Sequence, residues 1–210
     1  MIDIFVGIDP SMNSSGVTCL AYEDGKLIRE MYYIIKPDKL TKKEDAAEKA
    51  NIERFMYVLY QKPEYDKENN HAVEYYKTQI FKQILNDIEQ IIRKFIYQIT
   101  YSGIYNLYVC QEGISYGSAQ RTKSVFDLAG LNFLLRMMVI TKLNPTYFLI
   151  ATPAEIKKKT SGNGNCKKEV MVSLFKGIHP DFDLPKLDDI ADSFWMANYI
   201  KNLHDEGVIE

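Results

Sequence analysis

The sequence predicts an α/β fold in which helices flank a central mixed sheet of five strands. Five short apolar segments have the length of strands, and the longer segments after the third of them have the period of amphipathic helices. The first three strand segments follow one another directly, whereas each later strand segment follows a helical one. This order predicts a three-stranded meander that later strands extend into a mixed sheet.

The three strands of the meander are expected within the first 35 residues. Apolar residues alternate through residues 2–8, as in a half-buried strand. Turn-forming residues at 13–16 lead to a returning strand at 17–22. A hairpin turn at 23–26 then leads to the third strand, at about residues 27–35.

Two helices are expected before the fourth strand. Thr41 and Glu44 have the spacing of a capping box, which predicts a polar helix over about residues 42–60. A charged, exposed loop follows at 61–70, and then a long amphipathic helix at about 72–98. The core-facing stripe of that helix consists of Ile80, Ile84, Ile88, Ile91 and Phe95.

The second half of the chain continues this alternation. Strands are expected at 104–112 and 147–151, and helices at about 121–140, 167–177 and 189–203. In the helix at 121–140, the residues expected to face the core are Leu128, Leu131, Leu135 and Met138. This helix carries more apolar residues than one core contact needs, which predicts an interface: Phe126, Leu131, Phe133, Leu134, Met137 and Val139.

Length and composition predict a single domain over residues 1–210. At 210 residues and 46% hydrophobic content, the chain can bury a sizeable core. The longest apolar stretch, 131–140, is too short to cross a bilayer, so no membrane partner is expected. Because the N-terminus runs directly into a strand pattern, we expect no signal peptide and a cytoplasmic location.

The cysteines and histidines predict neither a zinc site nor a disulfide framework. Cys19, Cys110 and Cys166 are odd in number and widely spaced, which is typical of reduced thiols. The three histidines share no ligand spacing and are expected at the surface: His71, His179 and His204.

The net charge of −2 hides a local asymmetry. Lysines crowd residues 157–168 and aspartates crowd 181–192. The segment 152–166 has neither of the usual nucleotide-loop glycine patterns, so we expect a basic loop there. Its lysines are either phosphate contacts or a solvated helix face. Arg121 and Lys123 are likewise either phosphate contacts or a plain helix start.

Three separate segments of the chain each place an acid at the end of a strand or in a helix. Asp9 and Glu112 end apolar strands, and Asp189 lies one helical turn before Asp192. Singly, these acids have structural explanations: a turn after Asp9, an exposed loop at Glu112, and a helix N-cap at Asp188 or Asp189. Asp192, however, is flanked by apolar residues in its helix, where a charge is costly unless a cation neutralises it.

Taken together, these acids predict a carboxylate cluster that the fold assembles. Converging carboxylates repel one another and raise their own pKa values, and a pair of Mg²⁺ ions removes that penalty. Such a cluster is what a magnesium-dependent phosphodiesterase requires. Geometry alone leaves the helical ligand open, because Asp188 and Asp189 both share a helical face with Asp192.

In the order of its motifs, the chain resembles the RuvC-type Holliday junction resolvases of the ribonuclease H-like superfamily. The matching strings cover nearly the whole chain: Gly7-Ile8-Asp9-Pro10-Ser11, Ser15-Gly16-Val17, Glu112, Thr152-Pro153-Ala154, Lys157, Gly162-Asn163-Gly164, Lys168 and Asp189-x-x-Asp192-Ser193. No one string is specific, but the ordered set is. The resemblance implies a ribonuclease H-like nuclease domain that acts as a homodimer on four-way DNA junctions.

The resemblance also implies a role for each matched residue. It makes Asp9, Glu112, Asp189 and Asp192 catalytic acids that bind two Mg²⁺ ions, for which Mn²⁺ would substitute. Lys168 is implied as a further catalytic residue, because family members contact or polarise phosphate at this position and at Lys157. The candidate DNA contacts are Lys157, Lys158, Lys167, Tyr116, Arg121 and Lys123.

Two features depart from the bacterial pattern. Residues 38–73 form an insertion after the third strand. The family places an aromatic wedge shortly after the second acid, where this chain has Ser115, and Tyr116 is the nearest aromatic residue. The isoleucine-, lysine- and tyrosine-rich composition points to a phage or viral branch, which would act in the cytoplasm of a bacterial host if phage-encoded.

The sequence therefore predicts an endonuclease that resolves four-way and other branched DNA junctions by paired phosphodiester hydrolysis. Two alternatives stay open. One is another ribonuclease H-like nuclease, of terminase or debranching type, that acts as a monomer. The other is a junction-binding protein without catalysis, against which the presence of all four acids argues.

Overall fold

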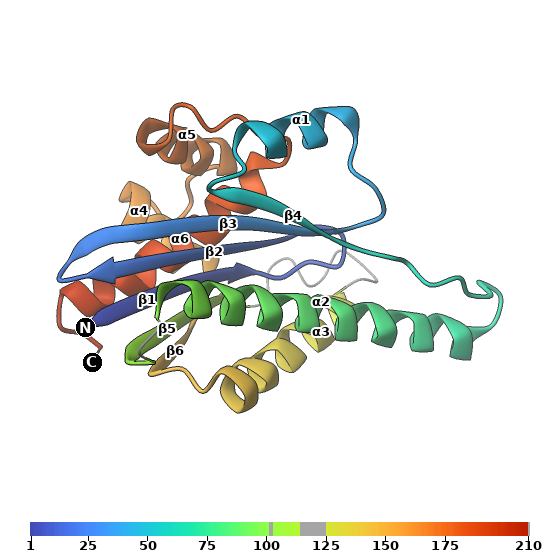
Figure 1. Ribbon diagram of the computed structural model, residues 1–210. Coiled ribbons are helices and arrows are strands. Elements are labelled where there is room, and N and C mark those ends of the chain that lie inside the picture. Colours follow the sequence, from blue (N-terminus) through green and yellow to red (C-terminus); the bar gives the residue numbers. More distant parts are fainter. Residues whose placement is uncertain (101–102, 114–124, 210) are drawn as a thin grey trace.

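One six-stranded sheet forms the centre of the computed structural model, which describes residues 1–100, 103–113 and 125–209 (Figure 1). Its order is β4-β3-β2-β1-β5-β6. Antiparallel pairing joins β1 to β2 and β2 to β3, whereas β1–β5, β5–β6 and β3–β4 are parallel. The strands are β1 (Ile2–Asp9), β2 (Ser15–Glu23), β3 (Lys26–Pro37), β4 (Phe55–Tyr60), β5 (Tyr105–Glu112) and β6 (Tyr147–Ala151).

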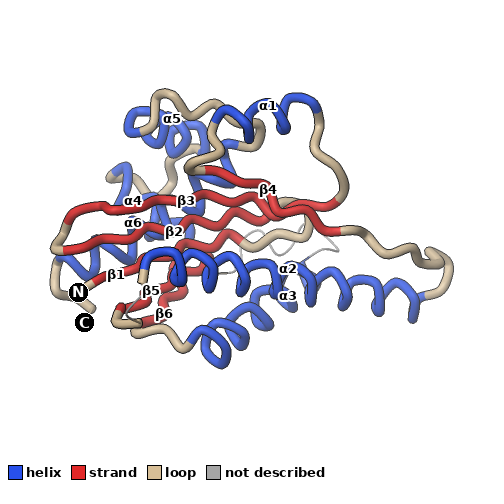
Figure 2. The backbone as a smooth tube through the Cα atoms, in the orientation of Figure 1, coloured by secondary structure: helices blue, strands red, loops and turns tan. Residues whose placement is uncertain are grey.

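Helices cover both faces of the sheet (Figure 2). One face carries α2 (Asn70–Ile99) and α3 (Val125–Met138), and a π-helical turn follows α3 at Val139–Leu143. The other face carries α4 (Pro153–Ser161), α5 (Lys168–Ile178) and α6 (Leu187–Asp205). The short helix α1 (Lys42–Ala50) lies beside the edge strand β4.

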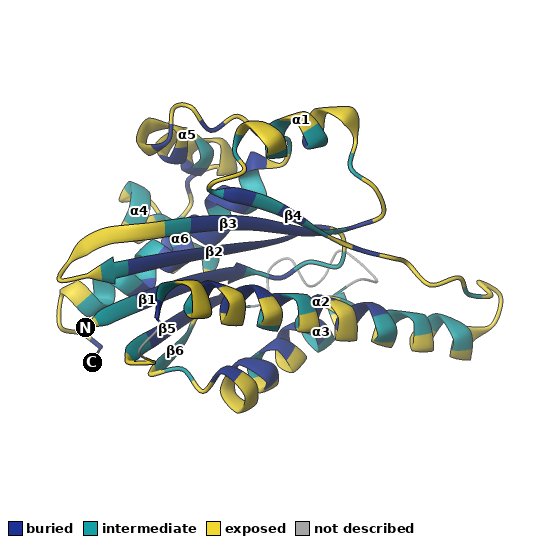
Figure 3. Ribbon diagram, in the orientation of Figure 1, coloured by how far each residue is buried: buried dark blue, intermediate teal, exposed yellow. Residues whose placement is uncertain are grey.

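The alternation predicted for the first strand divides the core into two layers. Ile4, Val6 and Ile8 pack against α2, whereas Phe5 packs on the face of α6. The stripe predicted for α2 is confirmed, because all five of its residues are buried. Figure 3 shows the central strands as largely buried and the outer surfaces of the helices as exposed.

The helix expected over residues 42–60 is wrong in its second half. It ends at Ala50, and residues 55–60 form β4. The aromatic side chains of Phe55, Tyr57 and Tyr60 are buried there, which suits a pleated surface better than a polar helix. The sheet therefore has six strands where five were expected, and the sixth comes from the predicted insertion.

The basic loop expected after β6 is instead the helix α4. Thr152 caps it and forms a capping box with Glu155, while Pro153 occupies the first turn, where no backbone donor is needed. Gly162 ends it in the left-handed conformation, with φ at 78°. The lysines of this segment therefore stand on a helix: Lys157, Lys158 and Lys159.

Two smaller expectations need correction. Leu131, Leu135 and Met138 face the core from α3 as predicted, but Leu128 is 38% exposed. His179 is buried among aromatic rings, whereas His71 is exposed.

The three cysteines are buried and unpaired, as the sequence predicts for reduced thiols. Among the described residues, no helix combines the length and apolar character that crossing a bilayer requires.

Candidate catalytic site

Asp9 and Glu112 lie at the same edge of the sheet, at the ends of two neighbouring parallel strands. Ile8 of β1 pairs with Gln111 of β5, so the two acids are the next residues in register. Alternation along both strands turns the two carboxylates toward the face that α6 covers. The sequence-based placement of these two acids is thus supported by the sheet register.

The helix α6 brings Asp189 and Asp192 toward the same place. It crosses β1 and β2 closely because each strand has a glycine beneath it. A Cβ atom on Gly7 would lie 1.9 Å from the backbone oxygen of Ser193, and one on Gly16 would lie 2.2 Å from that of Asp189. The two glycines therefore set how near the helical acids come to the strand acids.

Burial and mutual repulsion dominate the electrostatics of the four acids. Burial raises the pKa of Asp9 well above its usual value, and the charges of Glu112, Asp192 and Asp189 raise it further. Burial also raises the pKa of each of the other three carboxyls. A hydrogen bond with Asp9 partly offsets this rise in the pKa of Glu112.

Lys168 and Ser14 hold the two helical acids. The ammonium of Lys168 lies 2.9 Å from the carboxylate of Asp192 and 3.0 Å from that of Asp188. Burial alone lowers the pKa of Lys168, but its hydrogen bonds and attraction to these two acids raise it above its usual value. The hydroxyl of Ser14 donates a short hydrogen bond to the carboxylate of Asp189.

The structure separates Asp188 from Asp189, which the sequence pattern could not. The side chain of Asp188 is 46% exposed and is paired with Lys168. Asp189, in contrast, is one of the charges that raise the pKa of Asp9. These surroundings favour Asp189 as the member of the cluster.

The carboxylates of the four acids are suitable ligands for a hard divalent cation. All four side chains offer carboxylate oxygens, the ligands that Mg²⁺ prefers, and burial raises the pKa of each of them. Within the described ranges, however, no three Asp, Glu, His or Cys side chains converge closely enough to hold one ion. A bound cation would therefore have to draw these carboxylates closer together.

A cavity of about 120 Å³ adjoins the acids and is lined by Glu112, Asp192, Lys157 and Lys168. Its apolar walls consist of Pro153, Ile156, Met171, Trp195 and Met196. The indole N–H of Trp195 donates to the backbone oxygen of Met171 at 3.0 Å, which fixes the ring. Trp195 therefore forms a fixed wall of the cavity beside the acids.

The remaining candidates fall into two groups, and Ser14 is an additional residue of the site. Lys158 and Lys167 are exposed, on α4 and at the cap of α5. Ser14 contacts the cluster but was not predicted, because a serine in a turn has no signal of its own. The candidates on the segment after Glu112 lie outside the described residues: Tyr116, Arg121 and Lys123.

Comparison with known proteins gives a match in structure only. No protein-family model matches the sequence, and no curated protein matches it. The structure is similar to that of Thermus thermophilus RuvC, with a TM-score of 0.58 and 14% identity over 100% of this chain and 99% of that chain. It is also similar to T. thermophilus RuvC in complex with a Holliday junction substrate, with a TM-score of 0.56 and 14% identity over 100% and 98% of the two chains.

At 14% identity these similarities establish the fold, and the phage or viral origin stays a prediction. Full coverage of both chains means that the likeness includes the strands and the helix that carry the four acids. The chain therefore has the ribonuclease H-like fold of RuvC, as its motifs predict.

Proposed function

We propose that this chain is a divalent-metal-dependent endonuclease that resolves four-way DNA junctions. The observation that supports it best is the gathering of four partly buried acids, from β1, β5 and α6, in a chain with the fold of RuvC. One of the similar structures is a RuvC complex with a Holliday junction substrate, which suggests the substrate class.

In this proposal Asp9, Glu112, Asp189 and Asp192 hold two Mg²⁺ ions, and Mn²⁺ substitutes for them. Bound Mg²⁺ supplies a water of lowered pKa and charge stabilisation for the departing 3′ oxygen. Lys168 exchanges its ion pairs for the scissile phosphate, whose charge it neutralises. The expected products carry 5′-phosphate and 3′-hydroxyl ends, which a ligase can seal.

A synthetic four-way junction with each strand labelled in turn tests the proposal. We expect Mg²⁺-dependent nicks at symmetry-related positions in two opposed strands, and a linear duplex of the same sequence should remain intact. Unpaired nicks or cleavage of the duplex would indicate a terminase- or debranching-type nuclease. A mobility shift without any cleavage would indicate a junction-binding protein.

Lys157 is expected to contact DNA phosphate, since it stands on α4 beside the acids. Lys157→Ala should weaken junction binding and reduce the salt slope by roughly one unit. Lys168→Ala should do the same and also leave Asp188 and Asp192 without their cation. Lys159→Ala is the matched control, because Lys159 is paired with Glu206. Salt slopes unchanged in both test variants would mean that this surface faces away from DNA.

The outer surface of α3 is proposed as the interface of a homodimer. With the turn that follows it, it exposes a row of large apolar side chains: Phe126, Phe133, Leu134, Met137 and Ile140. Leu131 and Val139, also expected in the interface, are instead buried in the core. We expect a dimer at micromolar concentration in sedimentation, and a monomer for Met137→Glu. Val208→Glu, at a similarly exposed apolar residue near the C-terminus, should leave the dimer intact. A monomeric wild-type protein would contradict this prediction.

A further inference from the structure

Asp189 depends on two supports, one of which lies 175 residues before it in the chain. The first is Ser14, in the loop between β1 and β2, whose hydroxyl donates to the carboxylate of Asp189. The second is the beginning of α6, where the amide of Asp189 donates to the backbone oxygen of Lys186 at 3.1 Å. Tyrosines of the edge strand β4 donate hydrogen bonds to the backbone close to each support.

Tyr60 contacts the loop that carries the first support. Its hydroxyl donates to the backbone oxygen of Met12 at 2.5 Å, and its side chain is 1% exposed. Met12 lies two residues before Ser14, in a loop that Ser15 closes through hydrogen bonds of 2.9 and 2.7 Å with the backbone of Ser11. A displacement of Tyr60 would therefore move the residue that holds Asp189.

Tyr57 contacts the second support. Its hydroxyl donates to the backbone oxygen of Pro185 at 3.4 Å, immediately before Lys186, which caps α6 with a left-handed φ of 61°. The backbone N–H of Tyr57 donates to the carboxylate of Glu48 in α1 at 2.6 Å. The strand is thus tied on one side to α1 and on the other to the beginning of α6.

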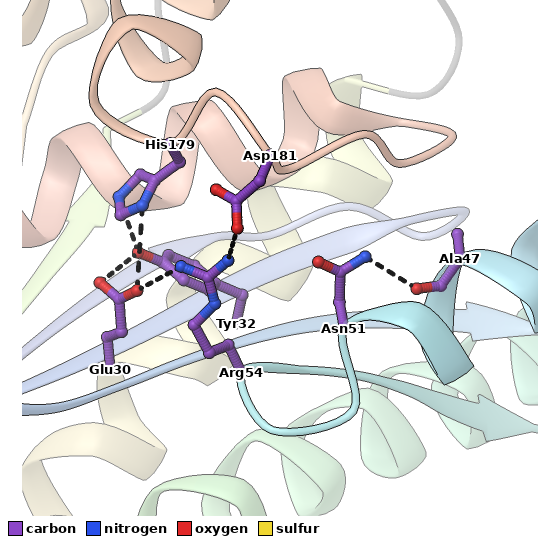
Figure 4. Close-up of polar contacts among 7 residues, drawn as sticks. All are labelled: Glu30, Tyr32, Ala47, Asn51, Arg54, His179 and Asp181. Carbon is purple, nitrogen blue, oxygen red and sulfur yellow. Dashed lines mark hydrogen bonds and ion pairs between the residues drawn. The ribbon is translucent and has the colours of Figure 1, made fainter.

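Arg54 anchors the start of β4 to the segment that follows α5. Figure 4 shows its guanidinium between Asp181, at 2.7 Å, and Glu30, at 3.3 Å. Glu30 also accepts from the hydroxyl of Tyr32 at 2.9 Å, and that hydroxyl lies 3.2 Å from the ring of His179. Within the described part of the chain, these contacts do not reach the four acids, so they anchor the strand without touching the site.

We propose that β4 is a positioning strand for the reaction, in which Tyr57 and Tyr60 fix both supports of Asp189 and thereby set the affinity for the divalent cation. This gives the insertion at residues 38–73 a role, and it rests on the proposed function. Phenylalanine at either position would fill the same space but would leave a backbone carbonyl without its donor. Hydroxyl removal therefore tests the positioning contacts while keeping the packing.

The test compares Tyr57→Phe, Tyr60→Phe and their double variant with Tyr32→Phe, which also loses a buried, hydrogen-bonded hydroxyl. In junction cleavage, the half-saturating Mg²⁺ concentration should rise about threefold to tenfold for Tyr60→Phe, and further for the double variant. The rate at saturating Mg²⁺ should stay near the wild-type rate. Hydrogen exchange should accelerate in residues 10–16 and 185–192. Tyr32→Phe should lose stability without changing the Mg²⁺ requirement.

An unchanged Mg²⁺ requirement and unchanged exchange in the double variant would overturn the proposal. An equal rise in the Mg²⁺ requirement of Tyr32→Phe would also overturn it, because the cause would then be general destabilisation. Absence of junction cleavage by the wild-type protein would refute the proposed function instead. In that case, hydrogen exchange and calorimetric titration with Mn²⁺ still decide whether the two tyrosines position Asp189.

Discussion

Replacing any of the four clustered acids by its amide is expected to abolish metal-dependent junction cleavage. Each amide keeps the volume of the side chain but removes a charge that holds a cation, so water activation and leaving-group stabilisation are lost together. We expect a decrease of about a thousandfold or more, equivalent to roughly 4 kcal/mol of transition-state stabilisation. The variants are Asp9→Asn, Glu112→Gln, Asp189→Asn and Asp192→Asn.

Junction binding should survive these substitutions, because affinity comes mainly from lysine–phosphate contacts. Gel-shift titration in the absence of metal separates this loss of catalysis from loss of binding. Asp188→Asn is the matched control, since Asp188 is half exposed and paired with Lys168. Full activity of Asp189→Asn together with loss of activity in Asp188→Asn would mean that Asp188, and not Asp189, belongs to the cluster. Full activity of Asp9→Asn would refute the nuclease proposal.

The same substitution at Asp9 should stabilise the metal-free protein. Because the pKa of Asp9 is raised in the fold, the native state binds a proton that the unfolded chain has released above about pH 4. The free energy of unfolding should therefore fall as the pH rises from that value toward the raised pKa. Asp9→Asn should reduce this dependence in denaturant titrations of the metal-free protein at several pH values.

The sequence predicted the parts of the site that periodicity controls. Strand alternation places Asp9 and Glu112 on one face of the sheet, and helical spacing places Asp189 and Asp192 on one face of α6. Both patterns are local, so they can be read before any tertiary contact is known. The stripe of α2 could be predicted for the same reason.

The parts that sequence reasoning missed depend on contacts distant in the chain or on overlooked local signals. β4 is stabilised by parallel pairing with β3, which no capping pattern reveals. Ser14 matters only because α6 lies beside its loop. The helix α4, in contrast, had a readable signal in Thr152, Pro153 and Glu155, which form a capping box with proline in the first turn.

The second large effect is expected when alanine replaces either of the two glycines, Gly7 and Gly16, on which α6 packs against the sheet. Gly7→Ala would place a Cβ atom 1.9 Å from the backbone oxygen of Ser193 and 2.6 Å from the amide of Ala197. Backbone atoms cannot rotate away as a side chain can, so α6 must move or the fold must strain. We expect a loss of stability of about 3 kcal/mol, or more, in denaturant titrations.

Gly16→Ala should have an effect of the same kind closer to the acids, because its Cβ atom would lie 2.2 Å from the backbone oxygen of Asp189. A shift of α6 by about 1 Å would separate Asp189 and Asp192 from Asp9, and misplacement on that scale can cost about a hundredfold in rate. Gly177→Ala is the matched control, since a Cβ atom there meets nothing within 4 Å. It should retain wild-type activity and stability. Wild-type stability and cleavage in both Gly7→Ala and Gly16→Ala would show that close approach of α6 does not set the geometry of the acids.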